Sequence, residues 1–216
     1  MMEKFTLVIG NKNYSSWSLR PWLVLKYFKI PFEEVQVVLA QPGTKEKILQ
    51  HSPAGKVPIL KHGKTVIWES LAICEHLAEL FSNRNLWPAD KNARATARSI
   101  ANEMHAGFIH LRKTCPVNIK ARKPLEKISP EVQRDITRIK GIWEDCRKQY
   151  KQKGDFLFGA FSIADAMYAP IHFRFQTYGI PLEGEAKKYS ESVLNLPEVK
   201  EWEAVAVKEL HVIEHH

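Results

Sequence analysis

Residues 5–80 alternate between short apolar runs and helical patterns, and this order restricts the possible folds more than any other feature of the chain. An early strand–helix–strand unit favours parallel strands, whereas His62-Gly63-Lys64 suits a hairpin turn between two later strands. We therefore expect an α/β unit with a small, mixed, four-stranded sheet. The expected strands are Phe5–Ile9, Glu33–Val38, Val57–Leu60 and Thr65–Trp68, and the expected helices are Leu19–Phe28, Lys45–Leu49 and Ser70–Leu80.

The character of the sequence changes at residues 82–92, which are rich in turn and helix-capping residues. Beyond them the pattern is almost entirely helical. The expected helices are Ala93–Leu111, Pro130–Tyr150, Ser162–Tyr178 and Pro197–Leu210. The predicted organisation is an α/β domain over residues 1–81, a linker over 82–92 and an all-helical domain over 93–216.

Charge and cysteine content exclude several function classes. The 216 residues carry a net charge of +8, but acidic residues interleave with the Lys and Arg residues, so we expect no nucleic-acid partner. The three cysteines form no CxxC pair, which argues against a disulfide scaffold and a structural zinc site. His105 and His110 are five apart, which does not suit a helical metal site. No leader or membrane-spanning run is visible, so the cytoplasm is the expected compartment, and His215 and His216 receive no function.

A cluster of hydroxyl groups stands where the first strand gives way to the first helix. Ser15, Ser16 and Ser18 lie in the run Asn13–Trp22, between Phe5–Ile9 and the following helical pattern. Free backbone N–H groups and the positive end of the helix dipole face an incoming group at such a place. The turn therefore favours binding of an anion, and a thiolate is one such anion.

Two further motifs follow in the α/β part. Pro58 interrupts an apolar run, so the Val57-Pro58 pair must lie at a strand edge, a strand start or a bulge. A cis bond there would leave the Val57 backbone free to pair with an extended peptide, although a simple loop proline is the alternative. At the start of a helix, Ser70 is a candidate N-cap beside Glu69, and the two could also hold a carboxylate and an amine.

A fourth motif lies in the helical part. Ser162 is followed three residues later by Asp165, just before the apolar run Ala166–Ile171. Serine and an acid at this spacing are typical of a capping box, which fixes the start of a helix. We interpret this motif as structural.

With these four motifs in this order, the chain resembles the cytosolic glutathione S-transferase family over nearly its full length. The resemblance implies a thioredoxin-like glutathione-binding domain, a helical domain that forms the acceptor-substrate pocket, and a homodimer. The pattern Ser15-Ser16-x-Ser18-x-Arg20 is most similar to the zeta class, which includes maleylacetoacetate isomerases. Trp17 stands where that class has a cysteine.

The resemblance also implies the roles of individual residues. Ser15 matches the serine that hydrogen-bonds the glutathione sulfur, with Ser16 as a second donor and Tyr14 as an alternative. The glutathione-binding residues would be Lys56, Val57, Pro58, Glu69 and Ser70. The acceptor pocket would include His105, Phe108 and Arg112, although helix packing is an equal alternative for these three. Cys115 is either a reactive thiol near that pocket or a passive buried residue.

The expected chemistry requires no metal. Lowering the pKa of a thiol from about 8.5 by about two units needs roughly 2.7 kcal/mol. One hydroxyl donor to a charged acceptor gives about 1.5–3 kcal/mol, and a helix end adds about 0.3–1 kcal/mol. We expect the protein to be a detoxifying glutathione transferase, in which the glutathione thiolate attacks small electrophiles. A glutathione-dependent maleylacetoacetate-type isomerase and a non-catalytic ligand-binding or interaction module are the alternatives.

Overall fold

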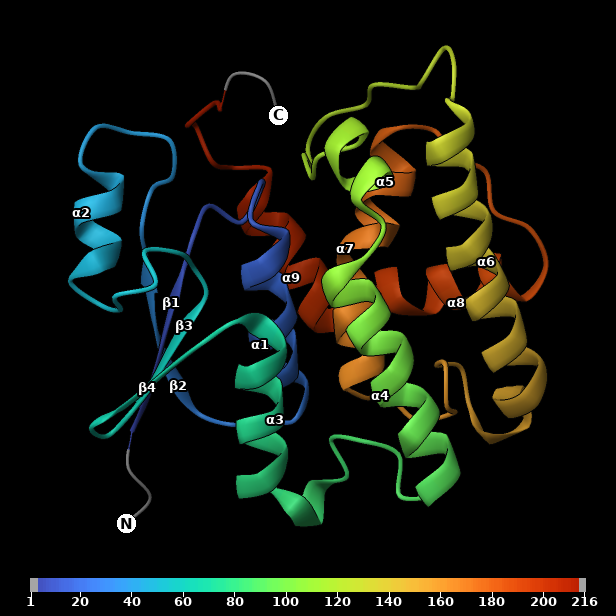
Figure 1. Ribbon diagram of the computed structural model, residues 1–216, viewed down its shortest axis with the longest axis horizontal. Coiled ribbons are helices and arrows are strands. Elements are labelled where there is room, and N and C mark those ends of the chain that lie inside the picture. The colour runs from blue at the N-terminus through green and yellow to red at the C-terminus, as the bar shows by residue number, and fades with distance from the viewer. Residues whose placement is uncertain (1–3, 214–216) are drawn as a thin grey trace.

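The sheet has four strands in the order β2-β1-β3-β4 (Figure 1). The computed structural model describes residues 4–213, so His215 and His216 lie outside the described residues. Strand β1 pairs in parallel with β2 and antiparallel with β3, which pairs antiparallel with β4. This confirms the predicted mixed sheet. The strands are β1 (Phe5–Ile9), β2 (Phe32–Gln36), β3 (Ile59–His62) and β4 (Thr65–Trp68).

Helices cover both faces of this sheet. Helices α1 (Ser16–Tyr27) and α3 (Ser70–Leu80) lie on the face toward the rest of the molecule, and α2 (Thr44–Leu49) lies on the other (Figure 1). Strand side chains alternate between faces, and β1 shows both environments. Leu7 and Ile9 belong to the large hydrophobic core, whereas Val8 packs with Ile48 and Ile59 in a small cluster.

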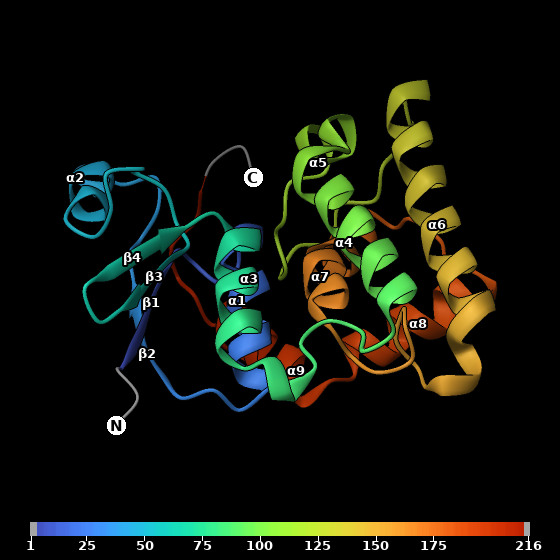
Figure 2. The same ribbon diagram turned by 60° about the horizontal axis from the view of Figure 1, so that its bottom comes forward.

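The remaining chain is helical, as expected. Helix α7 contacts α1, α4 and α8, and α1 also contacts α9, so one hydrophobic core extends from the sheet into the helices (Figure 2). The domain boundaries at residues 81 and 93 stay a prediction. The α-helices are α4 (Lys91–Ala106), α5 (Ile109–Thr114), α6 (Pro130–Tyr150), α7 (Ile163–Thr177), α8 (Gly184–Leu194) and α9 (Pro197–Ala206), with short 3-10 helices at Ser82–Arg84 and Lys151–Lys153.

Helix α7 begins at the predicted capping box. The backbone N–H of Ser162 donates to Asp165 Oδ2 at 2.8 Å, and the Ser162 hydroxyl donates to the same oxygen at 3.1 Å. The N–H of Leu157 donates to Asp165 Oδ1 at 3.0 Å. Burial raises the pKa of Asp165 to about 6, although these hydrogen bonds favour the carboxylate. The fully buried side chain thereby joins the loop before α7 to the start of the helix.

The prediction of one helix over Ala93–Leu111 is wrong, because the chain breaks between α4 and α5. Phe108 has a φ of 57°, which a helix interior does not permit. Gly107 lies so close to the preceding turn that an added Cβ would be 2.7 Å from the carbonyl oxygen of Glu103. Arg112, on α5, donates from its guanidinium to the carbonyl oxygens of His105 at 3.1 Å and Gly107 at 3.2 Å, and so bonds to the backbone at the break.

Some helix ends and caps also differ from expectation. Helix α1 begins at Ser16 rather than Leu19, because the Ser15 side chain accepts the N–H of Ser18 and caps it. Glu69, not Ser70, is the N-cap of α3, and Ser70 is its first residue. Helix α9 ends at Ala206, so the prediction that it extends to Leu210 is wrong. Helix α8 lies between Tyr178 and Pro197, where the sequence pattern predicted no helix.

The described cysteines form no disulfide, and all three are buried. Burial raises the pKa of the Cys115 thiol to about 11 and that of Cys146 to about 12, and it raises that of Cys74 further. A protonated, buried thiol is a poor nucleophile, so the passive interpretation of Cys115 fits the structure. Within residues 4–213, no helix has the length and apolarity to cross a membrane.

Candidate active site

The hydroxyl-rich turn before α1 is tightly bonded. The carbonyl oxygen of Asn11 accepts the N–H groups of Tyr14 at 3.1 Å and Ser15 at 2.8 Å. Ser15 Oγ accepts the N–H of Ser18 at 3.3 Å and lies 2.7 Å from Ser18 Oγ, which accepts the N–H of Gly10 at 3.1 Å. The Ser15 hydroxyl therefore has a defined position as the N-cap of α1, in the turn that follows the buried strand β1.

A cleft of about 680 Å³ opens beside this turn. It lies between the turn, the segment 55–57 and the α4–α5 region, and it brings together residues far apart in the sequence. Phe108 does not line it, because its side chain is buried in the core. The predicted site residues that line the cleft are Tyr14, Ser15, Ser16, Lys56, Val57, His105 and Arg112.

A smaller cavity of about 130 Å³ adjoins this cleft. Trp17, Lys56 and Val57 line both spaces, so the two are neighbours with a common wall. Pro58, Glu69 and Ser70 line the smaller one. Pro58 lies immediately before β3, and the Val57–Pro58 peptide bond is cis, the first of the two alternatives that the sequence left open. The predicted glutathione-binding residues thus gather around one small cavity, next to Ser15.

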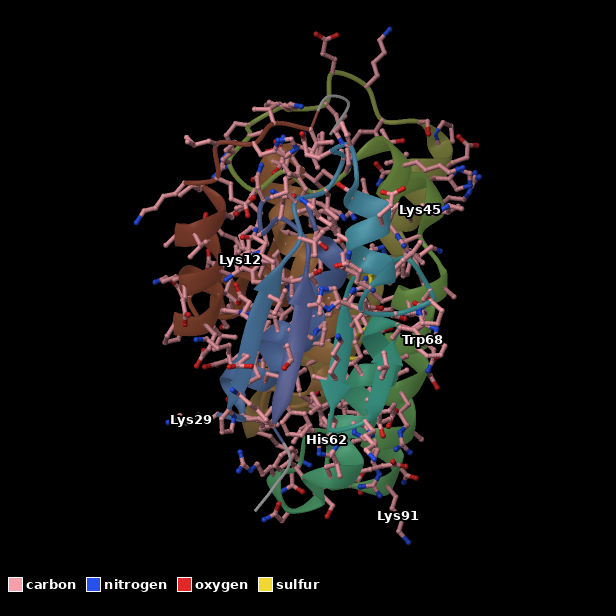
Figure 3. The ribbon with its side chains drawn as sticks, turned by 90° about the vertical axis from the view of Figure 1, so that its left-hand side faces the viewer. Lys12, Lys29, Lys45, His62, Trp68 and Lys91 are labelled. Atoms are coloured by element: carbon pink, nitrogen blue, oxygen red, sulfur yellow. The ribbon has the colours of Figure 1, made fainter. Side chains whose placement is uncertain are left out.

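Glu69 and Ser70 present polar groups to the small cavity. Ser70 is fully buried, and its Oγ has no hydrogen-bond partner among the described residues. Glu69 has φ 67° and ψ 124°, a sparsely populated conformation for a residue with a side chain, and it follows the exposed Trp68 at the end of β4 (Figure 3). Such backbone conformations are concentrated at functional sites. A ligand with a carboxylate would satisfy the Ser70 hydroxyl.

Trp17 forms the shared wall and is held by cations. The guanidinium groups of Arg20 and Arg112 lie 4.3 and 4.4 Å from its ring centre, and His105 meets it edge-on at 5.2 Å. His105 Nε2 also lies 3.5 Å from Glu69 Oε2. Burial and the charge of Arg20 lower the pKa of His105, which favours the neutral ring. The wall is therefore a fixed aromatic surface between the two spaces.

The cleft is strongly cationic. Lys56, Arg112, Lys113 and Arg174 line it, and none of its described lining residues is acidic. Arg20 is buried behind Trp17, and burial with the charges of Arg112 and Arg174 lowers its pKa to about 9. Charges of one sign in a low-dielectric cleft raise the local concentration of the opposite charge. An anionic or electron-rich ligand suits this space better than a cation.

Trp17, Arg20 and Arg174 belong to this site but were not among the predicted site residues. Trp17 and Arg20 stand inside the hydroxyl-rich motif, but their sequence positions did not show that they stack. Arg174 is far along the chain, inside the apolar α7, where a buried arginine is itself an unusual signal. Its guanidinium donates to the carbonyl oxygens of Arg112 and Cys115, which anchors it at the floor of the cleft.

Among the residues described, no group of three or more His, Cys, Asp or Glu side chains is placed to hold a metal ion. The polar side chains that line the two spaces are instead mostly hydroxyl, guanidinium and ammonium groups, together with the His105 imidazole and the Glu69 carboxylate. This donor set favours an oxygen- or sulfur-bearing anionic ligand.

Comparison with known protein sequences gives consistent results. Residues 14–80 match the family model described as glutathione S-transferase, N-terminal domain. The chain is 36% identical over 191 residues to a probable maleylacetoacetate isomerase of Caenorhabditis elegans, which covers 84% of this chain and 85% of that relative. It is 26% identical over 173 residues to human glutathione S-transferase omega-2, covering 80% of this chain and 68% of the relative.

Solved structures share the fold. A glutathione transferase homolog from Burkholderia, solved with bound glutathione, has a TM-score of 0.69 and 24% identity, covering 96% of this chain and 100% of that one. A tau-class glutathione S-transferase from mango has a TM-score of 0.70 and 19% identity, covering 94% and 96%. At these identities the likeness supports the α/β-plus-helical architecture.

Proposed function

This chain belongs to the glutathione S-transferase family, and from that membership we propose that it is a glutathione-dependent enzyme whose Ser15 hydroxyl stabilises the glutathione thiolate. One observation carries the proposal: the cleft that contains Ser15 and the cavity that contains the unpartnered Ser70 hydroxyl share a wall. An extended tripeptide can therefore have its thiol at one serine and its γ-glutamyl end at the other. The thiolate then attacks a small electrophile in the larger cleft.

The hydrogen bonds around Ser15 support a donor role. Ser15 Oγ already accepts the N–H of Ser18, and Ser18 Oγ already accepts the N–H of Gly10. A contact between two hydroxyl groups can have either one as the donor. When Ser18 donates to Ser15, the Ser15 proton is free to point at a sulfur. Ser15 then donates one charge-assisted hydrogen bond to the thiolate, and the positive end of the α1 dipole stabilises the same negative charge.

The other end of the tripeptide has matching partners. The Ser70 hydroxyl would donate to the γ-glutamyl carboxylate, and the Glu69 carboxylate would hold the amine. The backbone of Val57 would pair with the cysteinyl part between them, as in β-strand addition. Lys56 is exposed at the rim of both spaces and would meet the glycyl carboxylate. Each charged group of glutathione then has a partner of opposite charge or a hydroxyl donor.

Glutathione binding measured by calorimetry tests this proposal. The unmodified chain should bind glutathione, and Ser70→Ala should weaken binding by at least about 10-fold, because a hydrogen bond to a charged group is worth about 1.5–3 kcal/mol. Ser99→Ala is the matched control, since its helical hydroxyl donates to the carbonyl of Ala95 on an exposed face. Absence of binding by the unmodified chain would favour a non-catalytic interaction module with this fold.

The cationic cleft favours a second candidate, glutathione-dependent isomerisation of a maleylacetoacetate-type substrate. Such a substrate carries carboxylates as well as an activated double bond, and Arg112, Lys113 and Arg174 line the space where it would bind. The thiolate would add reversibly to the double bond, allow rotation and leave again. Trp17 stands where the zeta class has cysteine, so this turn offers no protein thiol, and the thiolate of glutathione would perform the addition.

Maleylacetone and a neutral aromatic electrophile, 1-chloro-2,4-dinitrobenzene, separate the two candidates. Arg112→Gln should lower the ratio of kcat/KM for maleylacetone to kcat/KM for the neutral compound about 10-fold, since it removes a charge-assisted contact. Arg134→Gln, an exposed arginine on α6, should leave the ratio unchanged. No turnover of maleylacetone by a chain that binds glutathione would remove the isomerase candidate.

A further inference from the structure

The chain beyond α9 turns back toward the sheet. We call residues 207–213 the return segment; it leaves α9 and passes the beginning of α1 (Figure 1). His211 Nε2 lies 3.1 Å from the carbonyl oxygen of Leu39, and Lys120 Nζ donates to the carbonyl oxygen of Glu209 at 2.7 Å. The segment therefore bridges the chain after β2 and the chain after α5.

The Glu209 side chain makes the most specific contacts of this segment. Its Oε1 accepts the backbone N–H of Lys12 at 2.7 Å, and its Oε2 accepts the backbone N–H of Asn13 at 3.1 Å. Gln36 Nε2 donates to Oε1 at 2.6 Å, which holds the carboxylate in place. One carboxylate thus binds two successive backbone N–H groups, an arrangement of charge-assisted hydrogen bonds with a fixed orientation.

Those two N–H groups belong to the turn that leads to Ser15. Lys12 and Asn13 are buried, and the following residues close the turn onto the carbonyl of Asn11. Asn13 is also tied to the chain after α5, because its Nδ2 donates to Asn118 Oδ1 at 3.1 Å and its Oδ1 accepts the N–H of Lys120 at 3.0 Å. The return segment therefore forms hydrogen bonds to Lys12 and Asn13, and the chain after α5 forms them to Asn13, in the turn just before Ser15.

We propose that Glu209 is a positioning residue for the active site: its carboxylate fixes the 12–13 peptide units and thereby the place of Ser15 Oγ relative to the sulfur of bound glutathione. This inference rests on the proposed function, because it concerns the same hydroxyl and the same sulfur. Glu209 lines neither the cleft nor the small cavity. It acts through the backbone, from a segment more than a hundred residues away along the chain.

Three possible roles of Glu209 differ in the sign of their effect on the bound thiol. If Glu209 positions Ser15, its loss weakens the Ser15–sulfur hydrogen bond and raises the pKa of the thiol. If the carboxylate acts only through its negative field, its loss lowers that pKa. If Glu209 only stabilises the fold, its loss lowers the melting temperature and leaves the pKa unchanged. The pH dependence of thiolate formation therefore distinguishes the roles.

The experiment compares Glu209→Gln and Glu209→Asp with Glu201→Gln. Glu201 is the matched control, since it forms an ion pair with Lys26 at 2.7 Å that also joins α9 to α1, away from the Ser15 turn. The probe is glutathione itself, followed by the ultraviolet absorbance of its thiolate against pH and by calorimetry. Turnover is measured with 1-chloro-2,4-dinitrobenzene, and thermal unfolding is recorded for every variant.

In Glu209→Gln we expect the pKa of the bound thiol to rise by about one unit and kcat/KM below that pKa to fall about 10-fold, because small displacements of a catalytic group have effects of this size. Glu209→Asp keeps the charge but not the reach, and we expect the same direction of change. Glu201→Gln should match the unmodified chain. A thiol pKa that is unchanged or lowered in Glu209→Gln overturns the inference while the proposed function stands. An unmodified chain that binds no glutathione overturns both.

Discussion

Ser15→Ala should lower kcat/KM for glutathione transfer by roughly 10- to 100-fold, because it removes a hydrogen bond to a charged sulfur worth about 1.5–3 kcal/mol. The pKa of the bound thiol should rise by about one to two units, so the acid limb of the pH–rate profile moves to higher pH. Glutathione affinity should change less, since the Glu69 and Ser70 end of the site is intact. A pH series of kcat/KM with one electrophile measures both effects.

Ser15 also caps α1, so the loss of a cap needs its own control. Ser129 caps α6 in the same way, by accepting the N–H of Val132 at 3.3 Å. Ser129→Ala should cost about 1 kcal/mol of stability and leave the thiol pKa unchanged. Two further variants address the other donors: Ser16→Ala and Tyr14→Phe should each keep most of the activity. A Tyr14→Phe variant as impaired as Ser15→Ala would assign the sulfur to the tyrosine instead.

Several elements of the α/β part were predicted well from the sequence, because the patterns that mark them are local. The strand Phe5–Ile9, the strand Thr65–Trp68 and the helix Ser70–Leu80 have the expected bounds, since alternation and one-sided apolarity lie within each element. Pro130–Tyr150 is also as expected, with Pro130 in its first turn and Ser129 as its cap. The break at Gly107-Phe108 could not be predicted from the sequence, because the hydrophobic pattern continues across it. The break depends on the close approach of Gly107 to the carbonyl of Glu103 and on the positive φ of Phe108.

The candidate site was partly predictable for a similar reason. Ser15, Val57 and Ser70 stand in short motifs whose spacing is visible in the sequence, and the structure gathers them around two adjoining spaces. Arg174 and Glu209 were not predicted, because each reaches the site from a distant segment through a single side chain. No periodicity marks such a residue. The contacts across the chain, not the local pattern, decide what surrounds Ser15.

The second large effect concerns stability. Asp165→Ala should lower the free energy of unfolding by about 3–5 kcal/mol, because it leaves the N–H groups of Leu157 and Ser162 buried without an acceptor, each at a cost of about 1–3 kcal/mol. The lost side chain is fully buried, so the variant also creates a cavity at the start of α7. Urea unfolding followed by circular dichroism measures the change.

Asp165→Asn separates the loss of the capping hydrogen bonds from the effect of a cavity, because asparagine keeps the side-chain volume and one oxygen acceptor. It should lose about half as much stability as Asp165→Ala, since one of the two backbone N–H groups then faces an amide donor. Asp145→Ala, an exposed aspartate on α6, should change the free energy of unfolding by less than about 0.5 kcal/mol. If Asp165→Ala were no more destabilising than Asp145→Ala, the capping box would not hold the loop before α7 to the helix, and the position of α7 against α1 would need another cause.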